Sequence, residues 1–513
     1  MLGLLDACDK YTEMGSKFLV IRALCGLAMA TVLAGCGGAG SSVSPPFMPP
    51  GGPPAPVTHA LRIGTDPFSN NNSQHATTVE PHAFAWGNAI VAAFQTGRFS
   101  TSGSSDIGFS ASRDGGNTWS SGALPGTTHY SQPAGIFDSI SDPVVAYDAA
   151  HAVWLISAIP VLFNNPPSPA ALVSRSTDGT TWSNPITVAP NQLQPDKDWI
   201  VCDNSTSSPF FGRCYLEWDE FGNGLTIHMS TSSDGGLTWS APQNTTGNGA
   251  GIGGQPLVGP QGRVVVPIDD PNEASILAYV SNDGGATWTQ PVLVSRISDH
   301  QDAGGVRSGP LPSAAIDAGG TVYLVWQDCR FETACSANDL VLSTSRDGIL
   351  WSTPARIPLD ALGSGVDHFI PGIGTAAGTS GSAAKLGLTY YYFPSANCSA
   401  ATCQLYVGSA SSSDGGTSWT APTPLAGPMS LTWLPQTNLG AMVGDYIATV
   451  FAASRPLGVF AVANPPAGTF DEGMYVPQPG VARAPGAVRA SAGERPIAGL
   501  RSDHALYHPK PIQ

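Results

Sequence analysis

The chain has 513 residues, of which 12% are charged and 42% hydrophobic, with 60 glycines and 45 prolines. This hydrophobic content is ample for a core and excludes wholesale disorder, while the many turn residues favour short strands over long solvated helices. The net charge of −15 excludes nucleic acid as a partner, because phosphate binding needs a basic surface, and an anionic substrate would need a local cluster of arginines.

Residues 1–36 are predicted to be a lipoprotein signal peptide. An apolar run over residues 18–33 follows Lys17, is broken only by Arg22, and ends in Leu33-Ala34-Gly35-Cys36. Small residues directly before a cysteine form the lipobox of bacterial lipoproteins, so Cys36 would become the lipidated N-terminus. The run is short for a transmembrane helix of about 20 residues. The alternative is a plain signal peptide in which Cys36 is incidental.

Residues 37–57 are rich first in Gly and Ser and then in Pro. This composition predicts a semi-rigid tether that does not pack into a core. We therefore expect an exported protein, lipid-anchored to the bacterial cell envelope, that touches the membrane through its N-terminal lipid only.

Beyond the leader, the remaining six cysteines fall in close pairs. An even number of cysteines in an exported chain favours disulfides, and short spacings predict small clips on loops. No histidine lies at ligand spacing beside any pair, so we predict no metal site there. The predicted disulfides are Cys202–Cys214, Cys329–Cys335 and Cys398–Cys403.

One short pattern, of which SRDGGNTW is the first copy, occurs six times at intervals of 49 to 68 residues. A repeat of this length indicates one supersecondary unit copied several times. Its Asp-Gly step supplies positive φ for a hairpin turn, and the Asp carboxylate can accept backbone N–H groups. The copies end at Trp119, Trp182, Trp239, Trp288, Trp351 and Trp419.

This pattern resembles the Asp box, or BNR repeat, of the sialidase superfamily over about residues 75–465. The resemblance predicts an all-β fold, a β-propeller over residues 58–478. Counting the strands gives six Asp-box blades and a seventh closed by the termini, whereas the analogy with sialidases gives six blades in total, which is the alternative. In the seven-blade form the run 59–63 supplies the fourth strand of the last blade. Residues 479–513 are predicted to be a poorly ordered tail.

The aspartates of the boxes are not predicted to be catalytic. They recur in every boxed blade, as a structural turn requires, whereas an active site is built from different residues on different blades. The box aspartates are Asp114, Asp178, Asp234, Asp283, Asp347 and Asp414.

The resemblance implies a catalytic set that the sequence matches only in part. Sialidases clamp the substrate carboxylate with three arginines, and they use a tyrosine nucleophile assisted by a glutamate, with an aspartate as acid/base. Arg98 and Asp106, ahead of the first box, match one clamp arginine and the acid/base. Arg307 is a second clamp candidate and Tyr446 the nucleophile candidate.

Several features oppose this mapping. The strand over residues 79–84 lacks the family's arginine, and no glutamate precedes Arg307 at the expected place. Arg330 and Asp339 repeat the Arg98 and Asp106 pattern ahead of the fifth box, so the pair can instead tie adjacent strands within each blade. A buried tyrosine that bonds a neighbouring blade is the alternative for Tyr446.

A second set of residues is polar where a strand should be apolar. Its members lie near the start of each blade's first strand or after its second, so in a propeller they would converge on the mouth opposite the Asp boxes. Such carboxylates can perform acid/base work, bind Ca²⁺ or hold sugar hydroxyls, and the alternative is a hydrated channel of paired charges. The predicted substrate-binding residues are Glu80, His82, Asp198, Glu217, Arg330, Asp367 and His368, and the set also includes Asp142 and Lys197.

Two functions follow from these observations. The first is a sialidase-like glycoside hydrolase that acts on extracellular glycans. The second, favoured by the incomplete clamp, is a non-catalytic propeller that binds a glycan or a glycoprotein at the cell surface. Neither requires a cofactor, although Ca²⁺ is a candidate ligand, and we expect a monomer. Arg98, Arg307 and Arg330 would share one pocket in the first case.

Overall fold

The computed structural model describes residues 57–164, 166–452, 454–479 and 487–489. The predicted signal peptide with Cys36, nearly all of the tether and most of the predicted tail lie outside the described residues. The predicted all-β class is confirmed, because the described elements are strands and short 3-10 turns. Those turns are η1 (Phe221–Asn223), η2 (Ala303–Gly305), η3 (Thr333–Cys335), η4 (Gly381–Ala383) and η5 (Leu431–Trp433).

In the described part of the chain the strands form seven successive four-stranded antiparallel meanders, which we call units 1 to 7. Units 1 and 2 join into one sheet through the pair Ser104 and Ile140. Unit 1 contains β3 (Gln74–Trp86), β4 (Ala89–Arg98), β5 (Ser104–Ser112) and β6 (Ser120–Ala123). Unit 2 contains β7 (Ser139–Asp148), β8 (Val153–Val161), β9 (Ala171–Ser176) and β10 (Ile186–Val188).

Units 3 to 5 are separate sheets of the same plan. Unit 3 contains β11 (Pro195–Cys202), β12 (Cys214–Glu220), β13 (Thr226–Ser232) and β14 (Gln243–Asn244). Unit 4 contains β15 (Leu257–Val258), β16 (Val264–Asp269), β17 (Ser275–Ser281) and β18 (Val292–Arg296). Unit 5 contains β19 (Ser313–Ile316), β20 (Val322–Asp328), β21 (Asp339–Ser345) and β22 (Ala355–Arg356).

Units 6 and 7 also take strands from the beginning of the described chain. Unit 6 contains β23 (Asp367–Thr375), β24 (Leu386–Phe393), β25 (Gln404–Ser412) and β27 (Thr423–Ser430), with β1 (Val57–Thr58) at its edge. Unit 7 contains β30 (Ala448–Ala452), β31 (Arg455–Ala463), β32 (Glu472–Pro477) and β2 (Ala60–Gly64). Two further pairs are β26 (Ser418–Thr420) with β33 (Ala487–Arg489), and β28 (Gln436–Thr437) with β29 (Gly440–Ala441).

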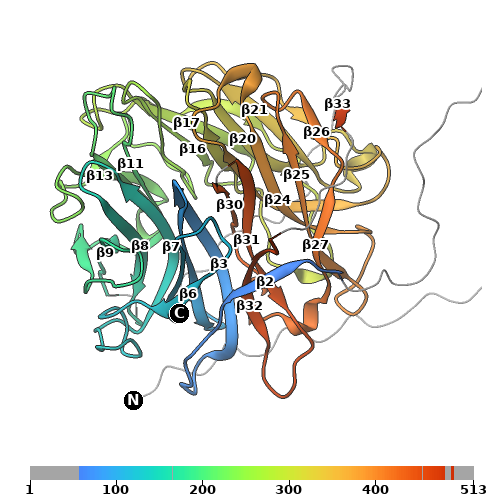
Figure 1. Cartoon of the computed structure of the whole chain (residues 1–513), viewed down its shortest axis with the longest axis horizontal. Helices are drawn as coiled ribbons and strands as arrows, with labels where there is room; N and C mark the ends of the chain where they lie inside the picture. The colour runs from blue at the N-terminus through green and yellow to red at the C-terminus, as the bar shows by residue number, and fades with distance from the viewer. Residues whose placement is uncertain (1–56, 165, 453, 480–486, 490–513) are drawn as a thin grey trace, which may run out of the picture. The chain divides into compact units, whose positions relative to one another are not determined.

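The N-terminal strand β2 completes the last unit. Leu61 pairs with Val476 of β32 in an antiparallel register, as expected for the run 59–63. In Figure 1 the blue β2 lies beside the red β32, so two ends of the described chain meet in one sheet. In addition, β33 falls in the segment predicted to be a poorly ordered tail, and pairs Arg489 with Ser418.

The first strands of the units contact one another in a closed series. In sequence order β3 contacts β7, β7 contacts β11, and the series continues through β15, β19 and β23 to β30, which contacts β3 again. Apolar side chains from facing sheets fill the space between neighbouring units, for example Phe109 of unit 1 against Trp182 of unit 2 at 5.8 Å between ring centroids. The core is therefore divided into layers between sheets.

The six box turns define one end of these units, which we call the box end. The Gly115 amide of the first box donates to the Asn88 carbonyl at 2.9 Å, so the loop between first and second strands lies at the same end. Loops that join second to third strands, and those that enter each first strand, lie at the opposite end because the strands alternate in direction. We call this the loop end.

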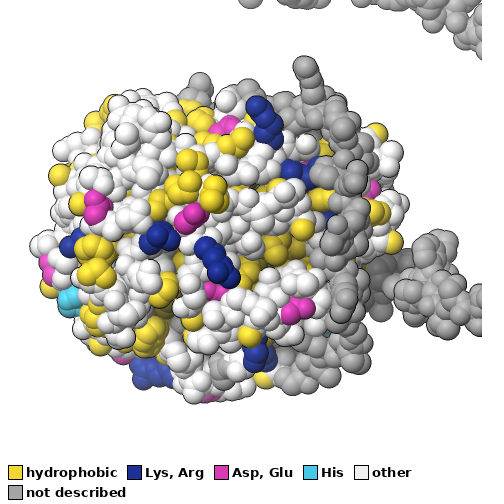
Figure 2. All heavy atoms as spheres, turned by 90° about the horizontal axis from the view of Figure 1, so that it is seen from above, with side chains coloured by type: hydrophobic (Ala, Val, Ile, Leu, Met, Phe, Trp, Pro, Cys, Tyr) yellow, Lys and Arg dark blue, Asp and Glu magenta, His cyan; other side chains and the backbone are white. Residues whose placement is uncertain are grey.

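The described residues contain the three predicted disulfides, which are confirmed. Disulfides persist in oxidising compartments, so they indicate an extracellular or periplasmic protein. Within the described ranges, every helix is too short or too polar to span a bilayer. On the face drawn in Figure 2, the coloured Lys and Arg side chains are interspersed with Asp and Glu and do not gather into one basic field.

Candidate functional site

Two of the predicted carboxylates sit on bulges at the loop end of the first strands. Glu80 on β3 and Asp142 on β7 have positive φ angles of 58° and 53°, and the strand register shifts beside each. Each is followed by a proline, Pro81 or Pro143, which cannot donate a ladder hydrogen bond. Positive φ in a non-glycine residue is costly and persists where surrounding contacts hold it. These bulges let both carboxylates converge on one lysine.

Lys197 on β11 is that lysine. Its Nζ lies 2.9 Å from Asp142 Oδ1, 3.0 Å from Asp445 Oδ2 and 3.6 Å from Glu80 Oε1. Burial opposes ionisation of Lys197, but the three carboxylates raise its pKa well above the ordinary value. Burial, together with Asp142, raises the pKa of Glu80 to about 8. The lysine is thus the positive centre of a buried acidic group.

Arg307 and Asp445 complete this arrangement. Arg307, in the loop before β19, donates from Nε to Asp445 Oδ1 at 2.7 Å and from Nη2 to Oδ2 of the same carboxylate. Against the effect of burial, Arg307 and Lys197 hold the pKa of Asp445 far below its usual range. We call Glu80, Asp142, Lys197, Arg307 and Asp445 the Lys197 cluster.

Arg98 lies close enough to the Lys197 cluster to interact with it. Its guanidinium donates to the Gly103 carbonyl, and burial together with Arg307 lowers the pKa of Arg98 to about 10. Asp106, eight residues further along the chain, has different surroundings. Its Oδ1 accepts from Thr127 Oγ1 at 2.5 Å, and burial raises the pKa of Asp106 to about 8. Arg98 and Asp106 therefore do not pair with each other to tie adjacent strands of unit 1.

Tyr446 is held by the neighbouring sheets. Its hydroxyl donates to the Pro143 carbonyl at 3.2 Å, which joins the loop before unit 7 to unit 2. Its ring lies 5.6 Å from Lys197 Nζ and 5.4 Å from the Trp199 ring. Burial raises the pKa of Tyr446 well above the ordinary value, which opposes a nucleophilic role. These contacts are those expected of a buried tyrosine that bonds a neighbouring unit.

His82 is part of the same aromatic layer. Its ring meets Trp199 at 4.7 Å between centroids, and its Nδ1 accepts from the Val145 amide at 3.0 Å. Burial lowers the pKa of His82 to about 3, so the ring is neutral at physiological pH. His82 therefore packs against Trp199, which contacts Tyr446 beside Lys197, and it does not add charge to the Lys197 cluster.

Asp198 and Glu217 lie on β11 and β12 of unit 3. Burial raises the pKa of each well above its ordinary value, and Asp219 adds to the effect at Glu217. Neither oxygen of Glu217 has a hydrogen-bond partner among the described residues. The side chain lies against Gly254, where a Cβ would come within 2.6 Å of its carboxylate. A glycine is thus required for Glu217 to fit between units 3 and 4.

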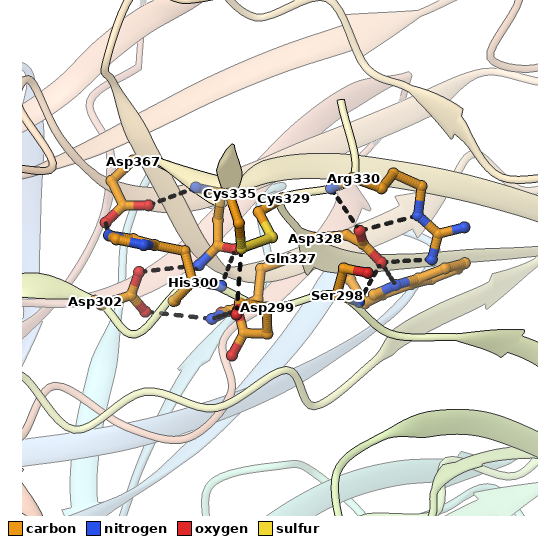
Figure 3. Close-up of a disulfide and its surroundings, with 12 residues drawn as sticks. Ser298, Asp299, His300, Asp302, Gln327, Asp328, Cys329, Arg330, Cys335 and Asp367 are labelled. Atoms are coloured by element: carbon orange, nitrogen blue, oxygen red, sulfur yellow. Dashed lines mark hydrogen bonds and ion pairs between the residues drawn. A yellow bond between two sulfur atoms is a disulfide. The ribbon is translucent and has the colours of Figure 1, made fainter. Parts of the chain in front are cut away.

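Asp367 belongs to a second acidic group, beside the Cys329–Cys335 disulfide (Figure 3). Asp367 Oδ1 accepts from the Asn338 amide at 2.7 Å, and His300 Nε2 lies 3.9 Å from Asp367 Oδ2. Asp302 accepts from Gln327 Nε2 at 3.2 Å. Burial raises the pKa of Asp367 to about 6. Asp302 and Arg307 lie in one loop, which therefore carries residues of both groups.

Arg330 lies outside the Lys197 cluster. Its Nε donates to Asp328 Oδ1 at 2.9 Å (Figure 3). Its Nη2 donates to the Arg296 carbonyl, and its guanidinium packs 5.9 Å from the Trp326 ring. Asp339 pairs instead with Arg356 at 2.7 Å. The structure thus brings Arg98 near Arg307 but does not bring Arg330 to them.

His368 is close to two carboxylates, and this group has the spacing of a metal site. One ligand atom each from Asp339, Asp360 and His368 lies within 4.8 Å of the others. However, Arg356 donates to Asp339 at 2.7 Å and to Asp360 at 2.5 Å, so its guanidinium already supplies the positive charge. The residues present therefore fit an arginine ion pair better than Ca²⁺.

The box aspartates form the turns predicted for them. In the third box Asp234 Oδ1 accepts from the amides of Leu237 and Thr238, each at 3.0 Å, and Asp234 Oδ2 accepts from the Thr238 hydroxyl at 2.6 Å. The Ser232 hydroxyl donates to Asp234 and accepts from the Gly236 amide. In all six boxes the carboxylate accepts hydrogen bonds from its own turn.

A family model described as a BNR repeat-like domain matches residues 87–357. The chain belongs to the BNR repeat-like family. No curated protein matches the sequence. Among solved structures, the chain is similar to a protein of unknown function from Dyadobacter fermentans (14% identity, 82% of this chain and 99% of that chain, TM-score 0.42). It is also similar to a mutant of the NanB sialidase from Streptococcus pneumoniae (14%, 81% and 70%, TM-score 0.40) and to a polysaccharide lyase of family 25, an ulvan lyase (11%, 82% and 95%, TM-score 0.45).

In this BNR repeat-like chain, the structure joins Glu80, Arg307, Tyr446 and the neighbouring Arg98 around Lys197. Asp445 was missed as a partner by sequence reasoning, although it holds both Lys197 and Arg307. Its only sequence signal is its place beside Tyr446, because a salt bridge between distant loops leaves no local pattern. Gln95, which donates to Glu80 and to Ser141, was missed for the same reason.

Proposed function

We propose that the seven units form a seven-bladed β-propeller. The closed series of contacts from β3 through β30 back to β3 supports it, since first strands line the axis of such a fold. The pairing of β2 with β32 supports closure by the N-terminal strand. On this proposal the Lys197 cluster lies on the axis at the loop end, and the box turns lie on the opposite face.

We also propose that this propeller binds a glycan at its loop end without cleaving it by the sialidase mechanism. One observation carries the proposal: the cations of the Lys197 cluster are already paired with the chain's own carboxylates. Arg307 is held by both oxygens of Asp445, and Lys197 contacts three carboxylates. A clamp for a substrate carboxylate needs guanidinium groups that are free to pair with it.

The chemistry of the loop end favours a neutral, hydroxyl-rich ligand. Asp196 and Trp199 are partly exposed beside the Lys197 cluster, and His300 is partly exposed beside Asp367. Carboxylates accept hydrogen bonds from hydroxyls, and an aromatic ring offers a flat apolar face. A neutral glycan would use these groups and would not require the paired cations.

The test is a binding and hydrolysis assay on the purified protein. We expect neutral glycans on an array to bind, and we expect Trp199→Ala to weaken that binding about tenfold through lost aromatic contact. Trp86→Ala is the matched control, because Trp86 is exposed at the box end. Loss of glycan binding in the Trp86 variant alone would show that the proposed place of the site is wrong. No binding to any glycan would show that the proposed ligand is wrong.

A sialidase-like hydrolase is the second candidate, and the proximity of Arg98 to Arg307 favours it. A fluorogenic sialoside and a panel of neutral glycosides distinguish the two. We expect no turnover of the sialoside. Turnover that disappears in both Arg307→Ala and Tyr446→Phe would establish the hydrolase and reject the binding proposal.

For the N-terminus, we propose that Cys36 carries the lipid anchor. The lipobox-like Leu33-Ala34-Gly35-Cys36 supports it, and the three disulfides support export. Mass spectrometry of the protein from bacterial membranes should find cleavage before Cys36 and a diacylglyceryl modification. An unmodified Cys36 in the mature protein would contradict it.

A further inference from the structure

A recurring contact joins the units at the box end. At five of the six box turns, an arginine of the preceding unit donates to a backbone carbonyl of the box. A guanidinium suits this task because its planar donors remain charged and reach several acceptors at once. The contacts are Arg455 to Gly115 at 3.3 Å, Arg113 to Asp178 at 3.0 Å, Arg175 to Gly235 at 2.7 Å, Arg213 to Gly284 at 2.7 Å and Arg263 to Arg346 at 3.0 Å.

Three of these arginines occupy equivalent positions. Arg213 and Arg263 directly precede the second strands of units 3 and 4, and Arg455 is the first residue of the second strand of unit 7. In unit 5 the residue that directly precedes the second strand, β20, is Thr321. Among the arginine side chains that the structure describes, none donates to the sixth box, residues 412–419. Unit 5 therefore lacks an arginine at the position that Arg213 and Arg263 hold in units 3 and 4.

A cleft of about 540 Å³ lies at this junction. Thr321 lines it on the unit 5 side, and Asp414 and Gly415 of the sixth box line it on the unit 6 side. Gly415 follows its box aspartate as Gly115, Gly235 and Gly284 follow theirs, and those three glycine carbonyls accept from arginines. The cleft thus adjoins the place that a guanidinium fills elsewhere in the chain.

The lining of this cleft is rich in acceptors. Asp347 and Asp414 both line it. Hydrogen bonds within the box turns lower the pKa of Asp347 and, against the effect of burial, that of Asp414, so both are ionised at neutral pH. The Gly381 carbonyl lies against Gly415, where a Cβ would come within 2.5 Å of it. Arg346 also lines the cleft, at the position that Arg113 holds in the first box. The acceptors favour a cationic guest with several donors.

We propose that the cleft between units 5 and 6 is a guanidinium-binding site that takes an arginine side chain from a basic segment of a partner protein. The guest guanidinium lies where Arg213 and Arg263 lie at the preceding junctions and donates to the carbonyls of box 6. The chain's net charge of −15 suits a basic partner. This site lies at the box end and goes beyond the glycan-binding proposal, because it holds whether or not the loop end binds a glycan.

The test measures binding of acetyl-arginine amide to the purified protein by calorimetry, with acetyl-citrulline amide as the uncharged probe. We expect one arginine site and affinity for the citrulline probe at least about tenfold weaker, because charge-assisted hydrogen bonds are lost. Thr321→Arg places an arginine side chain in the cleft, as Arg213 and Arg263 do at the preceding junctions, and should abolish binding of the probe. Thr321→Val, which keeps the cleft open, should leave binding unchanged.

A second variant tests the same idea by gain of a site. Arg263→Thr removes the arginine from the junction with box 5 and should raise the stoichiometry from one arginine probe to two. Unchanged binding in Thr321→Arg would overturn the proposal, as would equal binding of the citrulline probe or no binding of either probe.

Further variants test whether the guanidinium comes from a partner protein or from the chain itself. The backbone of Arg489 pairs with that of Ser418 in box 6, and the segment that follows contains Arg495 and Arg501. Two variants of the full chain test whether one of its own arginines fills the cleft: the double variant Arg495→Ala with Arg501→Ala, and Arg346→Ala. If the probe binds to either variant but not to the unsubstituted chain, an arginine of the chain itself fills the cleft and the partner proposal is overturned. Binding to the unsubstituted chain supports it.

Discussion

Arg307 and Asp445, which are 138 residues apart in the sequence, form a bidentate ion pair. It joins the loop that enters unit 5 to the loop that enters unit 7. The same carboxylate accepts from Lys197 of unit 3 at 3.0 Å. Asp445 therefore links three units through one side chain that is 3% exposed. We therefore expect the arrangement of the loop end to depend on Asp445.

Replacing Asp445 tests this dependence. Asp445→Asn leaves Arg307 and Lys197 without their shared negative partner in a buried place, and we expect a loss of about 3–5 kcal/mol in the free energy of unfolding. Urea denaturation measures it. Asp471→Asn is the control, since Asp471 pairs with Arg62 near the surface and should cost less than about 1 kcal/mol. Equal effects of the two substitutions would show that the Lys197 cluster is not a structural centre.

The buried Asp106 predicts a pH dependence of stability. Burial raises its pKa from 3.8 to about 8, so the folded state keeps a proton that the unfolded chain releases. The stability that this carboxyl contributes is fully present below about pH 4 and is lost as pH rises from about 4 to about 8. As pH rises from 5 to 8.5, the melting temperature of the Asp106→Asn variant should therefore fall by less than that of the unsubstituted protein. A parallel decline of both melting temperatures would contradict this origin.

The disulfides should differ in their contribution because they close loops of different length. Cys202–Cys214 spans 12 residues and Cys398–Cys403 spans 5. Loop entropy predicts losses of about 3 kcal/mol and about 2 kcal/mol respectively when each pair is replaced by serines. Guanidinium unfolding of the two double variants measures the order, and a larger loss for the shorter loop would show that native packing outweighs chain entropy.

The box turns should contribute to stability and not to activity. Asp234→Ala removes the acceptor for two amides and one hydroxyl of its turn, and we expect a loss of about 1–2 kcal/mol in unfolding free energy. Asp270→Ala, in a loop at the other end of the neighbouring unit, is the comparison. Any ligand binding measured for the protein should survive Asp234→Ala, whereas its loss would give the box a direct role.

Elements set by local pattern could be predicted from the sequence. The box turns, the strands around them and the disulfides follow from short motifs such as SSDGGLTW and from cysteines at most 12 residues apart. Even β2 could be assigned, because the last unit lacked a strand and the run 59–63 could supply it. For the box turns and the disulfides the determining contacts lie within a short stretch of residues, whereas β2 was assigned by counting the strands of the repeated units.

The candidate site needed the tertiary structure. Glu80 and Lys197 could be marked from the sequence as polar residues near strand starts, and Arg307 as a clamp candidate. The pairing of Lys197 and Arg307 with Asp445 could not be predicted, because the partners lie on different units. The matching motifs of Arg98 and Arg330 suggested equal roles, yet one lies near Arg307 and the other pairs with Asp328. Which arginine meets which carboxylate is decided by the spacing of packed sheets and by bulges that aim side chains, neither of which is encoded in a short stretch of residues.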